Sequence, residues 1–134
     1  MAAVPGEFAA PTLGVQEEED KMPAVKFLVL YPRPKDIETF EKLYQNEHVP
    51  MAVEKLAGKT KFVATKVLGS PAGTPPFYRV AEIHFPSMAA LEACAASEGG
   101  QQTLAHARSI SSGGEPIFLI AEEETFTFAQ TAMA

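Results

Sequence analysis

Val25-Lys26-Phe27-Leu28-Val29-Leu30-Tyr31 is the stretch of sequence that decides the fold. It is apolar at nearly every position, and it is followed by Pro32 and Pro34, which lack the amide that a strand ladder needs. A strand with apolar residues on both faces must be covered on both faces. The stretch therefore predicts a buried strand whose sheet has helices on one side and a second subunit on the other.

A helix is predicted immediately after this strand. Asp36 can accept hydrogen bonds from the free amides of a helix that begins at Ile37, and acidic residues follow in the first turn. Pro50 interrupts the apolar stripe of this helix, because proline cannot donate an interior hydrogen bond. Pro50 is therefore predicted to open a second helical segment, which Gly58 closes.

Alternating apolar residues, helix caps and turn residues define the remaining elements. Two strands are predicted, over Lys61–Leu68 and Tyr78–Phe85. Ser87 is a suitable cap for a helix, and Ser97 can cap its continuation, so a long and bent helical stretch is expected. Pro116–Ala121 is predicted to form the last strand.

The predicted order is strand, helix, strand, strand, helix, strand, which is the split βαβ or ferredoxin-like arrangement. This is an α+β fold with an antiparallel sheet and helices on one face only. The domain is predicted to span residues 24–128, with Thr125–Phe128 as a possible extension of the last strand. Residues 1–23 carry prolines, glycines and an acidic run, and they are predicted to form a flexible tail, as are residues 129–134.

Size and charge exclude several classes of function. A chain of 134 residues fits one domain, and 11 basic against 17 acidic residues give a net charge of -6, which disfavours nucleic acid as a partner. The apolar runs are far shorter than the ~20 residues of a membrane-spanning helix, and the N-terminus lacks a signal-peptide pattern. Cys94 has no second cysteine to pair with, which favours a reducing, cytoplasmic setting.

Strong catalytic motifs are missing from the sequence. There is no Cys-x-x-Cys pair, P-loop, dinucleotide fingerprint, His-Glu-x-x-His or Gly-x-Ser-x-Gly, although a site of scattered residues would escape this search. His48, His84 and His106 are too far apart in sequence to predict a metal site. Met51 and Met88 are interpreted as core-filling residues. We therefore predict neither a metal nor a cofactor.

His48 is the main catalytic candidate. It lies next to the break that Pro50 is expected to impose on the helix, and such a joint can aim a side chain into a cavity. An imidazole titrates near neutral pH and could move a proton to or from a bound molecule. The alternative is that His48 only caps the break or donates a hydrogen bond to a carbonyl group.

Further polar residues have two interpretations each. Tyr78, Glu82 and His84 are expected on one face of their strand, towards a cavity or a subunit contact, so Glu82 and His84 could form an acid-base pair or belong to that contact. Tyr31 could supply a phenol to the same cavity, or it could simply mark the end of its strand. His106 is expected to face solvent or the partner subunit.

The run Tyr44-Gln45-Asn46-Glu47-His48-Val49-Pro50-Met51, after a first strand ending in Leu-Tyr-Pro, resembles the EthD family of dimeric α+β barrel proteins. Residues 97–101 and the closing strand Ile117–Glu122 extend the resemblance, which covers residues 24–123. EthD-like sequences commonly carry an acidic residue near the position of Ala105-His106. The role of that acid is therefore not carried over to this chain.

The resemblance implies a homodimer with a cavity between each sheet and its helices. It also implies oxidoreductase-type or cofactor-free chemistry on a small apolar ligand, in a family named after a protein of ethyl tert-butyl ether breakdown. We predict an enzyme in which His48 acts as acid or base. The residues predicted to contact the ligand are Tyr31, Tyr44, Tyr78, Glu82 and His84. The alternatives are a non-catalytic carrier or accessory partner of an oxygenase, and a purely structural dimer.

Overall fold

The computed structural model describes residues 24–129, which contain four strands and two helical runs, one after β1 and one after β3. The strands are β1 (Ala24–Pro32), β2 (Lys61–Lys66), β3 (Phe77–Phe85) and β4 (Ile117–Glu123). The helices are α2 (Ile37–Leu43), the π-helix η1 (Tyr44–His48), α3 (Val49–Lys55), α4 (Met88–Ala96) and α5 (Glu98–Ile110). The expectations for residues 1–23 and 130–134 lie outside the described residues.

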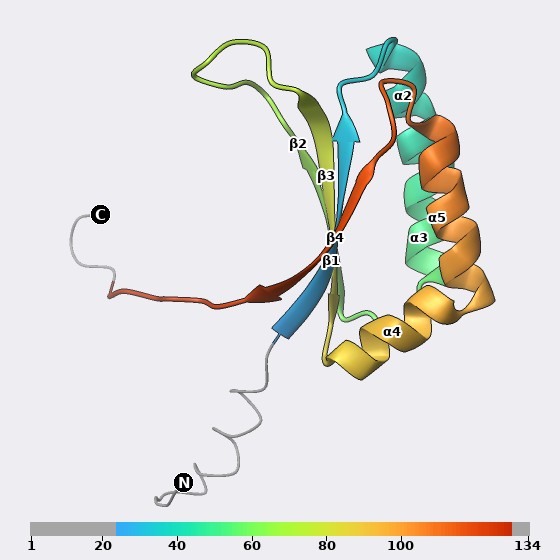
Figure 1. The fold of residues 1–134 in the computed structure, drawn as a ribbon, viewed down its shortest axis with the longest axis vertical. Coiled ribbons are helices and arrows are strands. Elements are labelled where there is room, and N and C mark those ends of the chain that lie inside the picture. The colour runs from blue at the N-terminus through green and yellow to red at the C-terminus, as the bar shows by residue number, and fades with distance from the viewer. Residues whose placement is uncertain (1–23, 130–134) are drawn as a thin grey trace, which may run out of the picture.

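The strands form one sheet in the order β2-β3-β1-β4, and every neighbouring pair is antiparallel. β1 and β2, which are joined by the first helical run, are therefore parallel to each other and separated by β3. All helices lie on one side of the sheet (Figure 1). This is the ferredoxin-like α+β arrangement, so the predicted fold class is confirmed.

Side-chain caps begin three of the helices, as the sequence predicts. Asp36, Ser87 and Ser97 each accept a hydrogen bond from the backbone amide three residues further on, at 3.2, 3.1 and 3.0 Å. Each cap satisfies an amide that has no partner inside its helix. Ser97 ends α4 and begins α5, and the two helices meet there at an angle (Figure 1). The expected bend is thus confirmed.

The break expected at Pro50 is a π-helical turn instead. The backbone stays helical from α2 through η1 into α3, and the amide of Val49 donates to the carbonyl of Tyr44, five residues earlier. In an α-helix the ring of Pro50 would press against the carbonyl of Asn46. A wider turn leaves room for that ring, and π-turns of this kind are frequent at functional sites.

The pleat of the sheet assigns the strand residues to two faces. Val25, Val29 and Tyr31 point to the helices and are buried, at 8, 4 and 0% exposure. Tyr78 was expected on the opposite face, together with Glu82, and this is wrong. A register shift opposite Tyr31 and Pro32 turns Tyr78 towards α2, where its ring centroid lies 5.9 Å from that of Phe40.

Within residues 24–129, no helix covers the other face of the sheet, which we name the open face (Figure 1). Ile117 and Leu119 are 41 and 45% exposed there. The strand extension over Thr125–Phe128 is wrong, because residues 124–129 form no strand and Phe126 is 74% exposed. Within residues 24–129, none of the helices is long and apolar enough to cross a membrane.

Candidate functional site

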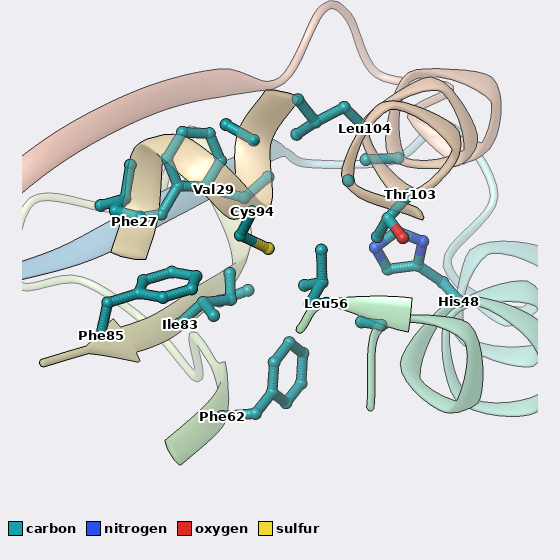
Figure 2. A pocket seen from close by; sticks show the side chains of 16 residues that line it. Phe27, Val29, His48, Leu56, Phe62, Ile83, Phe85, Cys94, Thr103 and Leu104 are labelled. Atoms are coloured by element: carbon teal, nitrogen blue, oxygen red, sulfur yellow. The ribbon is translucent and has the colours of Figure 1, made fainter. Parts of the chain in front are cut away.

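A pocket lies between the helix-facing side of the sheet and the helices. Its space is about 520 Å³, a figure that includes the solvent at its mouth. Figure 2 shows His48 at one end, beside Thr103, with Phe27 and Phe85 at the other end. The remaining wall is formed by Phe62 together with small and aliphatic residues, among them Ala81, Ile83, Leu56, Leu91, Ala95 and Ala107.

The surface of the pocket is apolar. The hydroxyl of Thr103 donates to the carbonyl of Gly99 within its own helix, at 2.7 Å, and it is therefore not free for a ligand. Burial raises the pKa of the Cys94 thiol, which keeps that side chain in its neutral, weakly polar form. His48 is thus the one strongly polar side chain at this wall.

The π-turn η1 positions His48. The π-turn ends at His48, directly before α3, and His48 is 4% exposed. Tyr44 precedes His48 by four residues, and their rings stack with centroids 5.9 Å apart. The segment that carries the family-like sequence therefore presents two adjacent rings to the core.

Both ring nitrogens of His48 have hydrogen-bond partners from other elements. Nε2 lies 3.1 Å from the hydroxyl of Tyr31 on β1, and Nδ1 lies 2.9 Å from Nδ1 of His106 on α5. Nε2 of His106 in turn lies 3.4 Å from a carboxylate oxygen of Glu47. His48 is thereby fixed between the sheet and the second helical layer.

Burial sets the charge of this group. It lowers the pKa of His48 to about 4, with a smaller contribution from the electrostatic interaction with His106. Burial also raises the pKa of Tyr31 far above its ordinary value, with a smaller contribution from Tyr44. At neutral pH, His48 and Tyr31 are therefore an uncharged pair.

Tyr44 lies behind His48, beneath an ion pair. Burial raises its pKa to about 12, and its hydroxyl is the one buried side-chain polar atom without a hydrogen-bond partner among residues 24–129. The guanidinium of Arg79 lies 4.8 Å above its ring and donates to both carboxylate oxygens of Glu41, at 2.9 and 2.7 Å. Tyr31 and Tyr44 therefore support His48 from outside the pocket, since neither lines its wall.

Glu82 and His84 lie elsewhere. They meet at 3.2 Å, but the register pairs Glu82 with Leu28 and His84 with Lys26, on the open face of the sheet. The idea that they share a cavity with Tyr31 is wrong, because the pleat turns Tyr31 to the opposite face. On the open face, Glu82 and His84 form a polar cluster with Lys26 and Glu123.

His106 and Glu47 are two members of the site that were not predicted from the sequence. His106 was expected to face solvent or a partner subunit, and this is wrong, because its Nδ1 lies 2.9 Å from Nδ1 of His48, with the ring planes 6° apart. No local signal in the sequence places α5 against η1. The nearest available hint was His106 itself, a titratable residue within a stretch that resembles the family.

In the part of the chain that the structure describes, no group of three or more His, Cys, Asp or Glu side chains is arranged to hold a metal ion. His48 and His106 come closest, but Nδ1 of each faces the other at hydrogen-bonding distance. The pair therefore acts as a donor and an acceptor.

Comparison with known proteins identifies the family. Residues 33–109 match the model of the EthD domain, which is more than half of the chain. The chain belongs to the EthD domain family. An uncharacterised 11.0 kDa protein from the thcB-thcC intergenic region of Rhodococcus erythropolis is 31% identical over 97 residues, which are 72% of this EthD protein and 92% of the relative.

Solved structures have the same fold. An ethyl tert-butyl ether D (EthD) family protein of Bacillus halodurans matches with a TM-score of 0.70 and 27% identity, over 75% of this chain and 99% of that one. A dimeric ferredoxin-like protein of unknown function from Bacteroides fragilis matches with a TM-score of 0.56 and 10% identity, over 75 and 96% of the two chains. At this identity the second likeness concerns the fold alone.

Proposed function

We propose that this EthD protein binds a small, largely apolar molecule in its pocket and that His48 transfers a proton to or from it. The main support is the position of His48, a buried imidazole at one end of an otherwise apolar pocket. A single polar group among apolar walls orients a ligand by the ligand's own polar atom. The hydrocarbon part of the ligand would then lie towards Phe27 and Phe85.

His48 is proposed to act first as a base. With a pKa of about 4, its ring carries one proton at neutral pH and offers one lone pair. The hydroxyl of Tyr31, which does not line the pocket, is hydrogen-bonded to Nε2, so it must turn away before His48 can accept a proton there. A base at this place can take a proton from a carbon beside a carbonyl group. Isomerisation, cyclisation and cofactor-free oxidation can all begin with that step.

The name of the Bacillus halodurans relative supports the size and polarity of the proposed ligand. Ethyl tert-butyl ether is a small molecule in which one oxygen atom is surrounded by hydrocarbon. A ligand of that kind matches an apolar pocket that His48 lines at one end. Small ethers are therefore included among the ligands proposed for this pocket.

Exchange of the α-protons of cyclohexanone for deuterium, followed by proton NMR, tests the catalytic proposal. We expect the native protein to accelerate exchange above the buffer rate, and H48Q to lose at least about a hundredfold of this acceleration. H84Q is the matched control, since His84 lies on the open face, and it should exchange at the native rate. Exchange in H48Q at the native rate would overturn the role of His48.

Carriage without catalysis is the second candidate function. The observation that favours it is that both nitrogens of His48 are already hydrogen-bonded within the protein. A carrier would bind cyclohexanone without accelerating exchange. Ligand-detected NMR should then show binding to native protein and H48Q alike, and loss of binding in A95L, which fills the pocket. A96L, at an exposed position of the same helix, is the matched control.

We also propose that a second copy of the chain covers the open face. Leu28 and Leu30 lie there half-buried, and Ile117 and Leu119 are more exposed than core residues. Such an apolar face is normally covered in a stable protein. The Bacteroides fragilis protein of the same fold is a dimer, which supports this arrangement.

A further inference from the structure

Four side chains form a continuous series of hydrogen bonds from the core to the surface. Tyr31, His48, His106 and Glu47 are joined by contacts of 3.1, 2.9 and 3.4 Å. Exposure rises along this order, from 0% for Tyr31 and 4% for His48 to side-chain values of 19% for His106 and 57% for Glu47. The series of hydrogen bonds therefore begins at Tyr31 in the core and ends at Glu47, which is in contact with solvent.

When His106 is neutral, the donors and acceptors of this series of hydrogen bonds fit together in one way. The carboxylate of Glu47 can only accept, so the proton of a neutral His106 sits on Nε2, and its Nδ1 is a lone pair. Nδ1 of His48 must then donate to Nδ1 of His106. This leaves a lone pair on Nε2 of His48, which accepts from the hydroxyl of Tyr31.

We propose that His106 and Glu47 form a proton-exit route, through which His48 can take a proton from a bound molecule without becoming a buried cation. The inference rests on the proposed role of His48 as a base. It adds two positioning residues, His106 on α5 and Glu47 on the π-turn η1.

The transfer conserves every proton. The proton of the bound molecule goes to Nε2 of His48, and its bonding electron pair stays on the molecule. The proton on Nδ1 of His48 moves to Nδ1 of His106, and the proton on Nε2 of His106 moves to the carboxylate of Glu47. Both imidazoles remain neutral and exchange tautomers. The reverse transfer returns a proton to the molecule and restores the first tautomers.

The surroundings of His48 explain why such a route would be needed. The groups that face it are Tyr31 from β1, Tyr44 from η1 and His106 from α5. Arg79 on β3 lies over Tyr44, where the carboxylate of Glu41 balances its charge. Among residues 24–129 no carboxylate is hydrogen-bonded to His48. A lone imidazolium there is disfavoured, which is why the pKa of His48 is low.

Imidazole NMR of nitrogen-15-labelled protein tests the route without any ligand. The chain has three histidines, and H84Q removes the signals of the one outside the route. We expect His48 to carry its proton on Nδ1 and His106 on Nε2. We expect E47Q, which still accepts from His106 but cannot take up a proton, to slow solvent exchange of the His48 proton at least about tenfold. E54Q, at an exposed glutamate of α3, should exchange at the native rate.

The results separate this route from the proposed function. A His48 proton on Nε2, or native exchange in E47Q, would overturn the route even if cyclohexanone exchange depends on His48. H106N gives a second measure, because its amide oxygen keeps an acceptor for Nδ1 of His48 but passes no proton onward. The expected tautomers with slowed exchange in both variants would support the route even if cyclohexanone proves inert.

Discussion

His48 and His106 lie with their ring planes 6° apart and their Nδ1 atoms 2.9 Å apart, although 58 residues separate them in sequence. The contact joins η1, in the first helical run, to α5, in the second, and both runs cover the same face of the sheet. It also links a residue at the pocket wall to one near the surface. The ionisation of His48 is therefore a property of the folded chain, and it can be measured through stability.

Acid should destabilise the native protein through His48. Its pKa falls from an ordinary 6.5 to about 4 on folding, so the unfolded chain takes up a proton in this interval and the folded chain does not. The contribution of His48 to stability is complete above pH 6.5 and is lost as the pH falls towards 4. We expect a loss of about 2 to 3 kcal/mol across this window.

Urea unfolding of native protein and H48Q at several pH values measures this loss. As the pH is lowered from 6.5 to 4, the free energy of unfolding of the native protein should fall more than that of H48Q. Other acidic groups titrate in both proteins, so the difference isolates His48. A difference that does not change with pH would show that His48 titrates normally in the folded protein.

The ion pair over Tyr44 should contribute strongly to stability. Arg79 is 7% exposed and donates to both carboxylate oxygens of Glu41. E41Q leaves the guanidinium charge buried without its counter-charge, and we expect it to lower the free energy of unfolding by about 2 to 4 kcal/mol. E38Q in the same helix removes an exposed pair with Lys42 and should cost less than about 0.5 kcal/mol. Equal effects of the two variants would contradict the prediction.

Local interactions account for the parts of the fold that the sequence predicts correctly. The caps at Asp36, Ser87 and Ser97 depend on residues three positions apart, so neighbouring residues suffice to locate them. The two-sided apolarity of the first strand likewise predicts a central position, and β1 has neighbours on both edges. Sequence order and strand count then leave few topologies to choose from.

The site is harder to predict because it depends on register and docking. One register shift moves Tyr78 to the helix side of the sheet, and this shift could not be predicted from the residues around Tyr78. His106 joins the site only because α5 packs beside η1, a contact between distant parts of the chain. Pro50 does disturb its helix, as expected, but the chain absorbs the disturbance in a π-turn. His48 could thus be singled out, whereas its partner on α5, His106, could not.

The junction of α4 and α5 should not tolerate a larger residue at Gly100. A Cβ atom there would collide with the backbone carbonyl of Cys94, which cannot rotate away. We expect G100A to lower the free energy of unfolding by about 2 to 4 kcal/mol in urea titrations. G69A is the control, because a Cβ atom at Gly69 meets nothing within 4 Å, and its stability should match the native value. An unchanged G100A would mean that the junction moves freely.

An aspartate on the open face should separate the proposed dimer. Leu119 is 45% exposed on β4, and its register partner Leu28 extends the same apolar surface. L119D would bury a carboxylate between two sheets, so we expect monomers in analytical ultracentrifugation where the native chain gives dimers. V53D places the same charge on α3, at a residue that is 52% exposed in the helical layer, and it should stay dimeric. Monomeric native protein, or dimers of L119D, would show that the open face is not covered by a second copy.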